Sequence, residues 1–247
     1  MLRHRPPGRR PPVTGRKSPC HGRDSGVADW LLVMLYDCRS LADRDRGVAA
    51  AVEAVKNGEL VVIPTDTVYG IGADAFTPYA VKALLNAKGR DRQHPPPVLV
   101  GSRRTLDGLV FMLPSTARDL ADAFWPGALT IVVEHSPSLQ WDIGDTGGTV
   151  AVRMPLHPVA LEVLRETGPM AVSSANKTGQ PAAVTAEEAR EHLGYAVRAY
   201  LEAGPCPEPV PSTIVDVTGE VPRVLRQGAI PLEKLRDVVP DIQGQVF

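Results

Sequence analysis

Short runs of apolar residues, each ending in polar side chains, recur along the chain and define its predicted strands. The first run, 60–63, stops at Pro64 and passes into Thr65, Asp66 and Thr67, a loop with two hydroxyls and a carboxylate. A short apolar run that stops at proline predicts a buried strand, and open α/β sheets bind ligands just beyond their strand ends. Thr67 is therefore the first candidate binding residue.

Three later segments repeat this arrangement. Residues 149–153 alternate in polarity and end on Arg153, whose planar guanidinium suits a carboxylate or a phosphate. The stretch 170–176 runs from apolar residues into two serines and an asparagine, and the stretch 212–216 opens with a serine hydroxyl. The repetition argues against coincidence.

Helical and strand patterns together predict one α/β domain. Helices and strands alternate in the first half, whereas the second half is rich in strands joined by short turns, which favours a mixed sheet over a purely parallel one. The predicted helices cover residues 46–56, 78–88, 115–124, 158–165 and 232–238, and further strands cover residues 129–133, 199–202, 212–217 and 223–225.

A cluster of cations follows the helix that Gly89 ends, with Lys88, Arg90, Arg92 and His94 close together. One interpretation makes Lys88 a cation that complements the helix C-terminal dipole, an effect of a few tenths of a kcal/mol to about 1 kcal/mol. The other makes the cluster an anion site, because these cations repel one another unless an anion lies among them. We favour the anion site.

Composition is typical of a soluble enzyme. The chain has 247 residues, of which 43% are hydrophobic and 22% charged, enough for one substantial core and too few for two large domains. No apolar run approaches the roughly 20 residues of a membrane span. Three cysteines without CxxC spacing predict neither a disulfide framework nor a zinc site. We expect a cytoplasmic location.

The first 34 residues form a basic, proline- and arginine-rich extension that we predict to be disordered. Residues 1–23 carry seven lysines or arginines and no acid, which leaves the remainder at a net charge of −8. A nucleic-acid-binding arm, a targeting peptide and translation begun upstream of a true start at Met34 are the three interpretations. We favour the last, because the apolar stretch 30–35 is too short for a signal peptide.

Seven ordered motifs carry a resemblance to a known family. They are PTDTVYGIGADAF, AKGR, FWPGALT, TVAVRMPLHP, SSANKTG, STIVD and RVLRQGAI, and in this order they resemble the YrdC/Sua5 family of threonylcarbamoyl-AMP synthases. The resemblance runs from about Arg46 to Ile230. It implies an α/β fold, a YrdC-like twisted mixed sheet with flanking helices around a large cationic groove. That catalytic domain would span 35–240, followed by a tail at 241–247 in place of the C-terminal Sua5 domain of longer members.

The resemblance also implies a reaction. L-Threonine, bicarbonate and ATP would give threonylcarbamoyl adenylate and pyrophosphate, and the product would feed t6A modification of adenosine 37 in tRNA through separate tRNA threonylcarbamoyl-transferase proteins. ATP is a substrate in this reaction, and Mg²⁺ would be carried by its phosphates, since no cluster of carboxylates in the sequence forms an obvious magnesium site. We expect neither a membrane partner nor stable direct binding to DNA.

The site residues follow from the resemblance, position by position. The positions that match threonine contacts are Thr67, Arg153, Ser174 and Ser212. The positions that match ATP contacts are Arg90, His94, Thr149, Asn176, Thr185 and Arg226. Lys88 and Arg90 are the predicted catalytic residues, with Lys88 assigned to the α-phosphate and the carbamate, where negative charge develops.

Several of these residues have simpler interpretations. Thr185 begins a capping-box pattern that explains it without a nucleotide. Without the resemblance, Ser212 is better interpreted as a strand residue, and the simpler interpretation of Thr149 is an ordinary β-former on an edge strand. The simpler interpretation of Arg226 is a surface partner for Glu220 or Asp237.

Two other functions remain as alternatives. One is an RNA-binding module without catalysis, although a net charge of −8 outside the extension and few aromatic residues argue against broad contact with a phosphate backbone. The other is a carbamoyl-adenylate enzyme of the hydrogenase-maturation type. That class also carries cysteine-rich zinc modules and an acylphosphatase part, for which this chain has no room.

Overall fold

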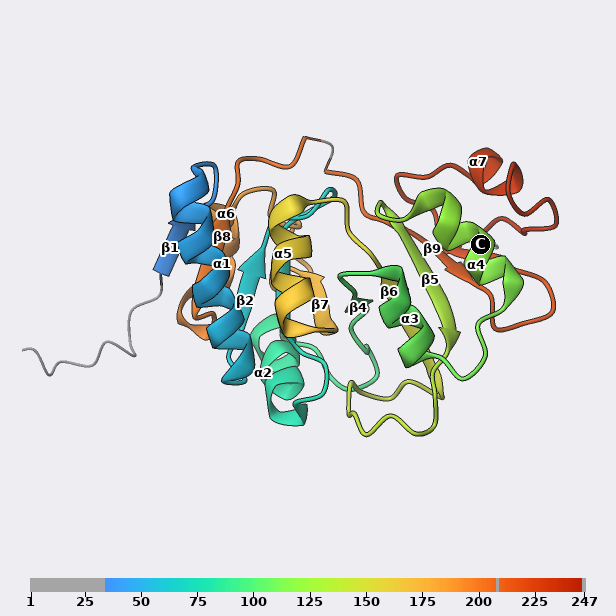
Figure 1. The fold of residues 1–247 in the computed structure, drawn as a ribbon, viewed down its shortest axis with the longest axis horizontal. Coiled ribbons are helices and arrows are strands. Elements are labelled where there is room, and N and C mark those ends of the chain that lie inside the picture. The colour runs from blue at the N-terminus through green and yellow to red at the C-terminus, as the bar shows by residue number, and fades with distance from the viewer. Residues whose placement is uncertain (1–33, 208, 246–247) are drawn as a thin grey trace, which may run out of the picture. The chain divides into compact units, whose positions relative to one another are not determined.

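One sheet organises residues 34–207 and 209–245, the part of the chain that the computed structural model describes (Figure 1). These residues belong to one unit, Val33–Phe247, and the predicted extension lies outside them except for Met34. The described strands are β1 (Met34–Asp37), β2 (Val61–Ile63), β3 (Gly70–Asp74), β4 (Val98–Leu99), β5 (Leu129–Glu134), β6 (Thr149–Arg153), β7 (Met170–Ser174), β8 (Ala199–Glu202), β9 (Thr213–Asp216) and β10 (Arg223–Arg226).

The sheet mixes parallel and antiparallel neighbours, as predicted. Its strand order is β1-β8-β2-β3-β7-β4-β6-β5-β9-β10. β8 runs parallel to both β1 and β2, β4 runs parallel to β6, and β5 runs parallel to β9, whereas the other neighbouring pairs are antiparallel. The site residues on strand ends that are distant in sequence can therefore meet.

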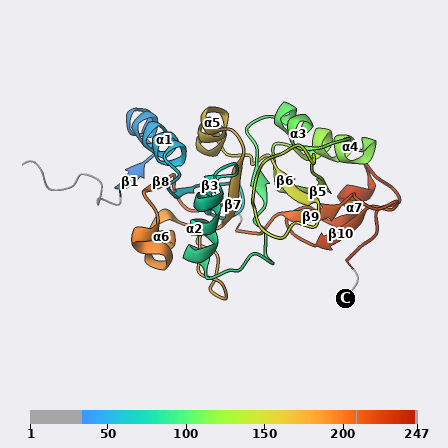
Figure 2. The same ribbon diagram turned by 90° about the horizontal axis from the view of Figure 1, so that it is seen from below.

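The helices lie on both faces of this sheet. The described helices are α1 (Leu41–Lys56), α2 (Pro78–Lys88), α3 (Arg103–Leu109), α4 (Ser115–Phe124), α5 (Pro158–Thr167), α6 (Ala186–Leu193), the short 3-10 helix η2 (Gly194–Ala196) and α7 (Leu232–Arg236). Figure 2 shows α1, α5, α3 and α4 on one side of the sheet and α2 and α6 on the other. No helix in the described ranges is both long enough and apolar enough to cross a membrane.

β2 shows why its apolar run forms a buried strand. Val61 and Ile63 lie in a cluster with residues of α1 and α5, whereas Val62 between them packs with residues of α2 and α6. Successive side chains of a strand point to opposite faces, so a strand that helices cover on both faces is apolar throughout. β2 is therefore a fixed base for the polar loop that follows it.

β5 has two different faces. Leu129, Ile131 and Val133 pack into the core with α3 and α4. Thr130 points the other way and lines the cavity described below. The alternation of β5 thus gives a core on one face of the sheet and a polar surface on the other.

The predicted helices differ from the observed ones mainly at their ends. α1 begins at Leu41, with Ser40 as its N-cap residue, and not at the predicted residue 46. The prediction missed this first turn because the turn projects into solvent, with Leu41 77% exposed. A turn that contacts no core has no apolar periodicity to detect. α4 has the predicted bounds, and α7 ends at Arg236, two residues before the predicted end.

Candidate functional site

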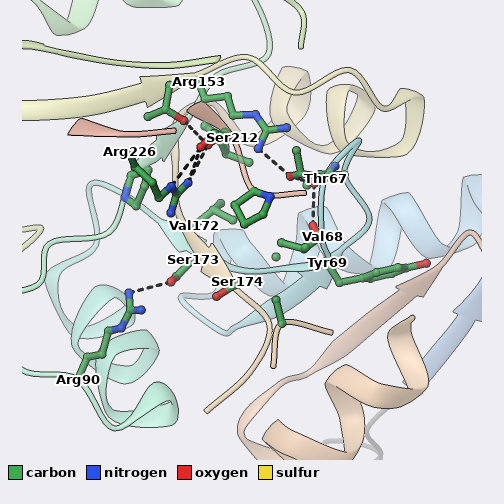
Figure 3. Close-up of a pocket in the computed structure, with 17 residues that line it drawn as sticks. Thr67, Val68, Tyr69, Arg90, Arg153, Val172, Ser173, Ser174, Ser212 and Arg226 are labelled. Atoms are coloured by element: carbon green, nitrogen blue, oxygen red, sulfur yellow. Dashed lines mark hydrogen bonds between the residues drawn. The ribbon is translucent and has the colours of Figure 1, made fainter. Parts of the chain in front are cut away.

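Several strand ends converge on a cavity of about 200 Å³, drawn in Figure 3. The loop after β2, the ends of β6 and β7, and the residues before β9 all contribute to its wall. Its polar lining comes from Thr65, Thr67, Arg90, Thr130, Arg153, Ser173, Ser174, Ser212 and Arg226.

Strand pairing explains how distant residues meet here. Ile63 at the end of β2 pairs with Gly70, and Gly70 pairs in turn with Ser174 at the end of β7. The loop that carries Thr67 is therefore held beside Ser174. On the other side, Thr130 and Ser212 hydroxyl oxygens lie 2.8 Å apart.

All four residues predicted to bind threonine line this cavity, together with two of those predicted to bind ATP. They are Thr67, Arg153, Ser174 and Ser212, joined by Arg90 and Arg226. The other predicted residues, Lys88, His94, Thr149, Asn176 and Thr185, lie outside the lining. The roles of both groups remain predictions.

Each of the three nitrogens of the Arg153 guanidinium makes one hydrogen bond to the protein. Nε donates to Gly127 O at 2.9 Å, Nη1 donates to Thr67 Oγ1 at 2.9 Å, and Nη2 donates to Asp66 Oδ1 at 2.7 Å. Burial lowers the pKa of Arg153, while the negative charge of Asp66 opposes that shift. A guanidinium has five N–H donors, so two remain for a ligand.

The Thr67 hydroxyl is left as a hydrogen-bond acceptor. Thr65 Oγ1 donates to Val68 O at 2.7 Å, so the 3.0 Å contact between the two threonine hydroxyls uses the proton of Thr67. Thr67 Oγ1 already accepts from Arg153. A hydroxyl oxygen has two lone pairs, so one lone pair of Thr67 remains for an N–H or O–H of a ligand.

Arg226 is bound to Ser212 and not to a surface carboxylate. Its Nη2 donates to Ser212 O at 2.8 Å and approaches Ser212 Oγ at 3.2 Å, and its Nε donates to the same carbonyl at 3.2 Å. Burial lowers the pKa of Arg226. The interpretation of Arg226 as a partner of an exposed acid is wrong, because β10 lays its side chain against the start of β9.

Lys88 is a buried cation behind the lining. Its side chain is 1% exposed, and Nζ donates to Ser174 O and, at 2.7 Å, to Asn176 O. Asn176 Oδ1 and Ser174 Oγ lie at 3.3 and 3.4 Å from the same nitrogen. Burial, with a smaller contribution from Arg90, lowers the pKa of Lys88 to about 7. The interpretation of Lys88 as a cation at the helix dipole fails, because the side chain turns inward to these oxygens.

The cation cluster is partly neutralised by the chain's own acids. Arg92 Nη2 lies 2.8 Å from Asp142 Oδ1, and Arg92 Nε lies 3.2 Å from Asp145 Oδ1. His94 Nδ1 lies 2.7 Å from Asp91 Oδ1. These acids therefore relieve the repulsion around Arg92 and His94 without an external anion, whereas no ion pair of the described residues involves Lys88 or Arg90.

Arg90 is the member of this cluster that reaches the cavity. Its Nη1 donates to Ser173 Oγ at 3.2 Å, the bond drawn in Figure 3. It therefore brings a positive charge to the cavity lining in addition to those of Arg153 and Arg226.

Thr185 caps α6, as the capping interpretation predicts. Its Oγ1 accepts from Glu188 N at 3.2 Å, and Glu202 Oε2 accepts from Ala186 N at 2.9 Å. A free helix N-terminus attracts anions, but a carboxylate of the chain already occupies this one. The Glu188 carboxylate bonds Val184 N and not the N-cap residue, so the capping box is incomplete.

Thr149 and Asn176 make local contacts. Thr149 Oγ1 donates to Thr146 O at 3.0 Å, and β6 lies between β4 and β5, so the edge-strand interpretation is wrong. The Asn176 amide donates to Lys177 O at 3.0 Å and to Gln180 O at 2.6 Å. Asn176 thus closes the turn that follows β7.

Four residues of the site were missed as candidates. Thr65, Thr130 and Ser173 line the cavity, and Asp66 lies directly behind it, bonded to Arg153. Thr65 and Asp66 stand in the same polar loop as Thr67, so the signal was present in the sequence. Thr130 and Ser173 lie within strands, where side-chain direction depends on which strands are neighbours.

The fold and the cavity define an α/β protein with a small cavity that arginines and hydroxyls line at its strand ends. The family model Sua5_yciO_yrdC, described as "Telomere recombination", matches residues 53–228. The chain belongs to this family.

Relatives and solved structures agree with this assignment. A Mycobacterium tuberculosis (strain H37Rv) protein named "Putative threonylcarbamoyl-AMP synthase" is 59% identical over 204 residues, which cover 83% of this chain and 94% of the relative. The Bacillus subtilis protein named "Threonylcarbamoyl-AMP synthase" is 36% identical over 204 residues, 82% of this chain and 59% of that protein.

The structure of P. abyssi Sua5 complexed with L-threonine superposes with a TM-score of 0.81 and 35% identity, covering 86% of this chain and 63% of that one. E. coli YciO, at 22% identity and a TM-score of 0.70 over 83% of this chain and 98% of the other, shows the same fold. The chain thus spans nearly the whole mycobacterial relative and less than two thirds of the longer P. abyssi protein.

Proposed function

We propose that the chain is a threonylcarbamoyl-AMP synthase, a nucleotidyltransferase that converts L-threonine, bicarbonate and ATP to threonylcarbamoyl adenylate and pyrophosphate. The names of its relatives support this activity, and the P. abyssi Sua5 complex supports threonine as the amino acid. The adenylate would pass to separate tRNA threonylcarbamoyl-transferase proteins for t6A modification.

The observation that carries the proposal is the pairing of donors and acceptors in the cavity. The two uncommitted N–H groups of Arg153 suit a carboxylate, and the remaining lone pair of Thr67 suits an amine N–H. A cavity of about 200 Å³ is smaller than the roughly 300–1,000 Å³ of pockets for drug-sized ligands, so it fits one small amino acid. ATP would extend beyond it, past Arg90 and Arg226.

The main task of the protein in this reaction is to position the reactants. The threonine nitrogen bonds to the bicarbonate carbon with loss of water and gives a carbamate. A carbamate oxygen then bonds to the α-phosphorus of ATP, and the bond from that phosphorus to the leaving pyrophosphate breaks. Holding the reactants in line supplies about 7 to 11 kcal/mol of the barrier reduction.

The chain's arginines would supply the charge neutralisation. Arg90 and Arg226 line the cavity and would contact phosphate oxygens, where each charge-assisted hydrogen bond contributes about 1.5 to 3 kcal/mol. Lys88, assigned to the α-phosphate and the carbamate, would contribute there through Ser174 and Asn176, whose oxygens its ammonium binds.

We propose that Mg²⁺ arrives with the ATP phosphates. Within the described residues, no group of three or more histidine, cysteine, aspartate or glutamate side chains is arranged to hold a metal ion. Mg²⁺ in nucleotide sites commonly keeps several waters and is bound through substrate phosphates.

Mass spectrometry of the product tests the proposal. The purified chain is incubated with L-threonine, ATP, Mg²⁺ and isotopically labelled bicarbonate. We expect an adenylate that contains threonine and carries the label in its carbamoyl carbon. Absence of this adenylate, together with tight binding of tRNA by the same preparation, would favour the RNA-binding module.

A further inference from the structure

Asp66 joins two loops behind the cavity without lining it. One oxygen, Oδ1, accepts from Arg153 Nη2 at 2.7 Å and from the Leu156 backbone N–H at 2.9 Å. The loop after β2 is thereby tied both to the end of β6 and to the segment that leads into α5. The side chains of Arg153 and Asp66 are 8% and 16% exposed, so the pair is largely shielded from water.

The anchors of Arg153 differ in strength. Gly127 O and Thr67 Oγ1 are neutral acceptors, whereas Asp66 is the carboxylate that directly bonds the guanidinium. A buried charge is costly unless it is paired, and hydrogen bonds between charged groups are stronger than neutral ones. Asp66 therefore decides which edge of the guanidinium turns to the protein and which edge turns to the cavity.

We propose that Asp66 is the positioning residue for substrate binding by Arg153. It fixes the guanidinium so that its two uncommitted N–H groups face the carboxylate of the bound amino acid. It also balances the charge of Arg153, so this part of the site suits an amino acid that carries an amine as well as a carboxylate. The inference rests on the proposed function.

The test compares Asp66→Ala and Asp66→Asn with Asp142→Asn. Asp142 makes a bidentate pair with Arg92 that is about half exposed, and because neither residue lines the cavity, Asp142 serves as the matched control. L-Threonine binding is measured by calorimetry, and the KM values for threonine and ATP are measured by pyrophosphate release.

We expect Asp66→Ala to weaken threonine binding and raise its KM about tenfold or more, because truncating one partner of a buried charge pair is strongly unfavourable. The KM for ATP should change less than about twofold, a difference too small to reflect a lost charge-assisted bond. Asp66→Asn, which keeps the shape and the acceptor, should show a smaller rise in the same direction, and Asp142→Asn should match the wild type.

A second background separates positioning from general structural damage. In Arg153→Lys there is no planar fork to orient, so adding Asp66→Asn should leave threonine affinity nearly unchanged. Equal losses for threonine and ATP, or the same fold loss in both backgrounds, would overturn the proposal. If Asp66→Ala does not fold, the comparison of Asp66→Asn in the wild-type background with Asp66→Asn in the Arg153→Lys background decides alone. Threonine binding by the wild type without pyrophosphate release would count against the proposed function and leave the Asp66 comparison intact.

Discussion

Replacing Lys88 with methionine removes the ammonium that joins Ser174 to Asn176 and nearly preserves the length of the side chain. Two effects on stability oppose each other. The carbonyl oxygens of Ser174 and Asn176 lose their buried donor, at a cost of about 1 to 3 kcal/mol each. Against this, the variant no longer buries a charge: lowering a lysine pKa from 10.5 to about 7 destabilises the charged form by about 5 kcal/mol.

The two terms are similar in size, so we expect the free energy of unfolding at pH 7 to change by about 3 kcal/mol or less. Activity should respond more strongly. Ser174 lines the cavity, and a displacement of about 1 Å in a reacting group can lower the rate about 100-fold. We therefore expect kcat/KM for adenylate formation to fall by about two orders of magnitude or more.

The pH dependence of stability gives an independent check on Lys88. Its folded pKa of about 7 lies below the ordinary 10.5, so between these values the unfolded chain binds more protons than the folded chain. Stability from this group therefore rises with pH across that window and is lost as pH falls toward 7.

Urea denaturation of both proteins at pH 7 and pH 9 measures this difference. The wild type should gain about 2 kcal/mol over Lys88→Met between the two conditions. If the wild type does not gain stability relative to Lys88→Met between pH 7 and pH 9, the burial argument is refuted. Near-normal activity of Lys88→Met would remove Lys88 from the mechanism.

Three further predictions concern other parts of the chain. Arg153→Ala should raise the KM for threonine more than the KM for ATP, and steady-state kinetics showing the reverse would mean that the two substrates are assigned to the wrong residues. Thr185→Ala should lower the free energy of unfolding by about 0.5 to 2 kcal/mol, whereas Thr185→Asn should keep the cap; a raised KM for ATP in both variants would indicate nucleotide contact as well. Burial raises the pKa of Cys38 and of Cys206 to about 11, so both thiols should react slowly with a disulfide reagent at pH 7 and quickly in urea; fast labelling of either of these two cysteines in the folded chain, identified by peptide mapping, would contradict their burial.

Three residues of the cavity lining that sequence patterns singled out lie beside the ends of strands. Thr67 and Ser212 flank apolar runs, and Arg153 ends an alternating run, so local periodicity was enough to place them at strand ends. The same reasoning predicted the mixed sheet, since elements that pair across short turns leave a different pattern from alternating helices and strands.

What sequence patterns could not provide is the choice of partners across the sheet. β8 inserts between β1 and β2, although it lies far from both in the chain. Arg92 pairs with Asp142, a residue distant in the chain, so the chain itself neutralises one of the clustered cations. Lys88 turns inward because the end of β7 lies beside α2, and no local pattern encodes that neighbour.

Pyrophosphate release from ATP by the purified chain tests the central claim most directly, with threonine and bicarbonate supplied together and then omitted in turn. We expect pyrophosphate release to require both threonine and bicarbonate. We also expect Arg153→Ala to reduce this release when threonine is limiting. Release that continues with neither co-substrate, or no release under any condition from a folded preparation, would contradict the account.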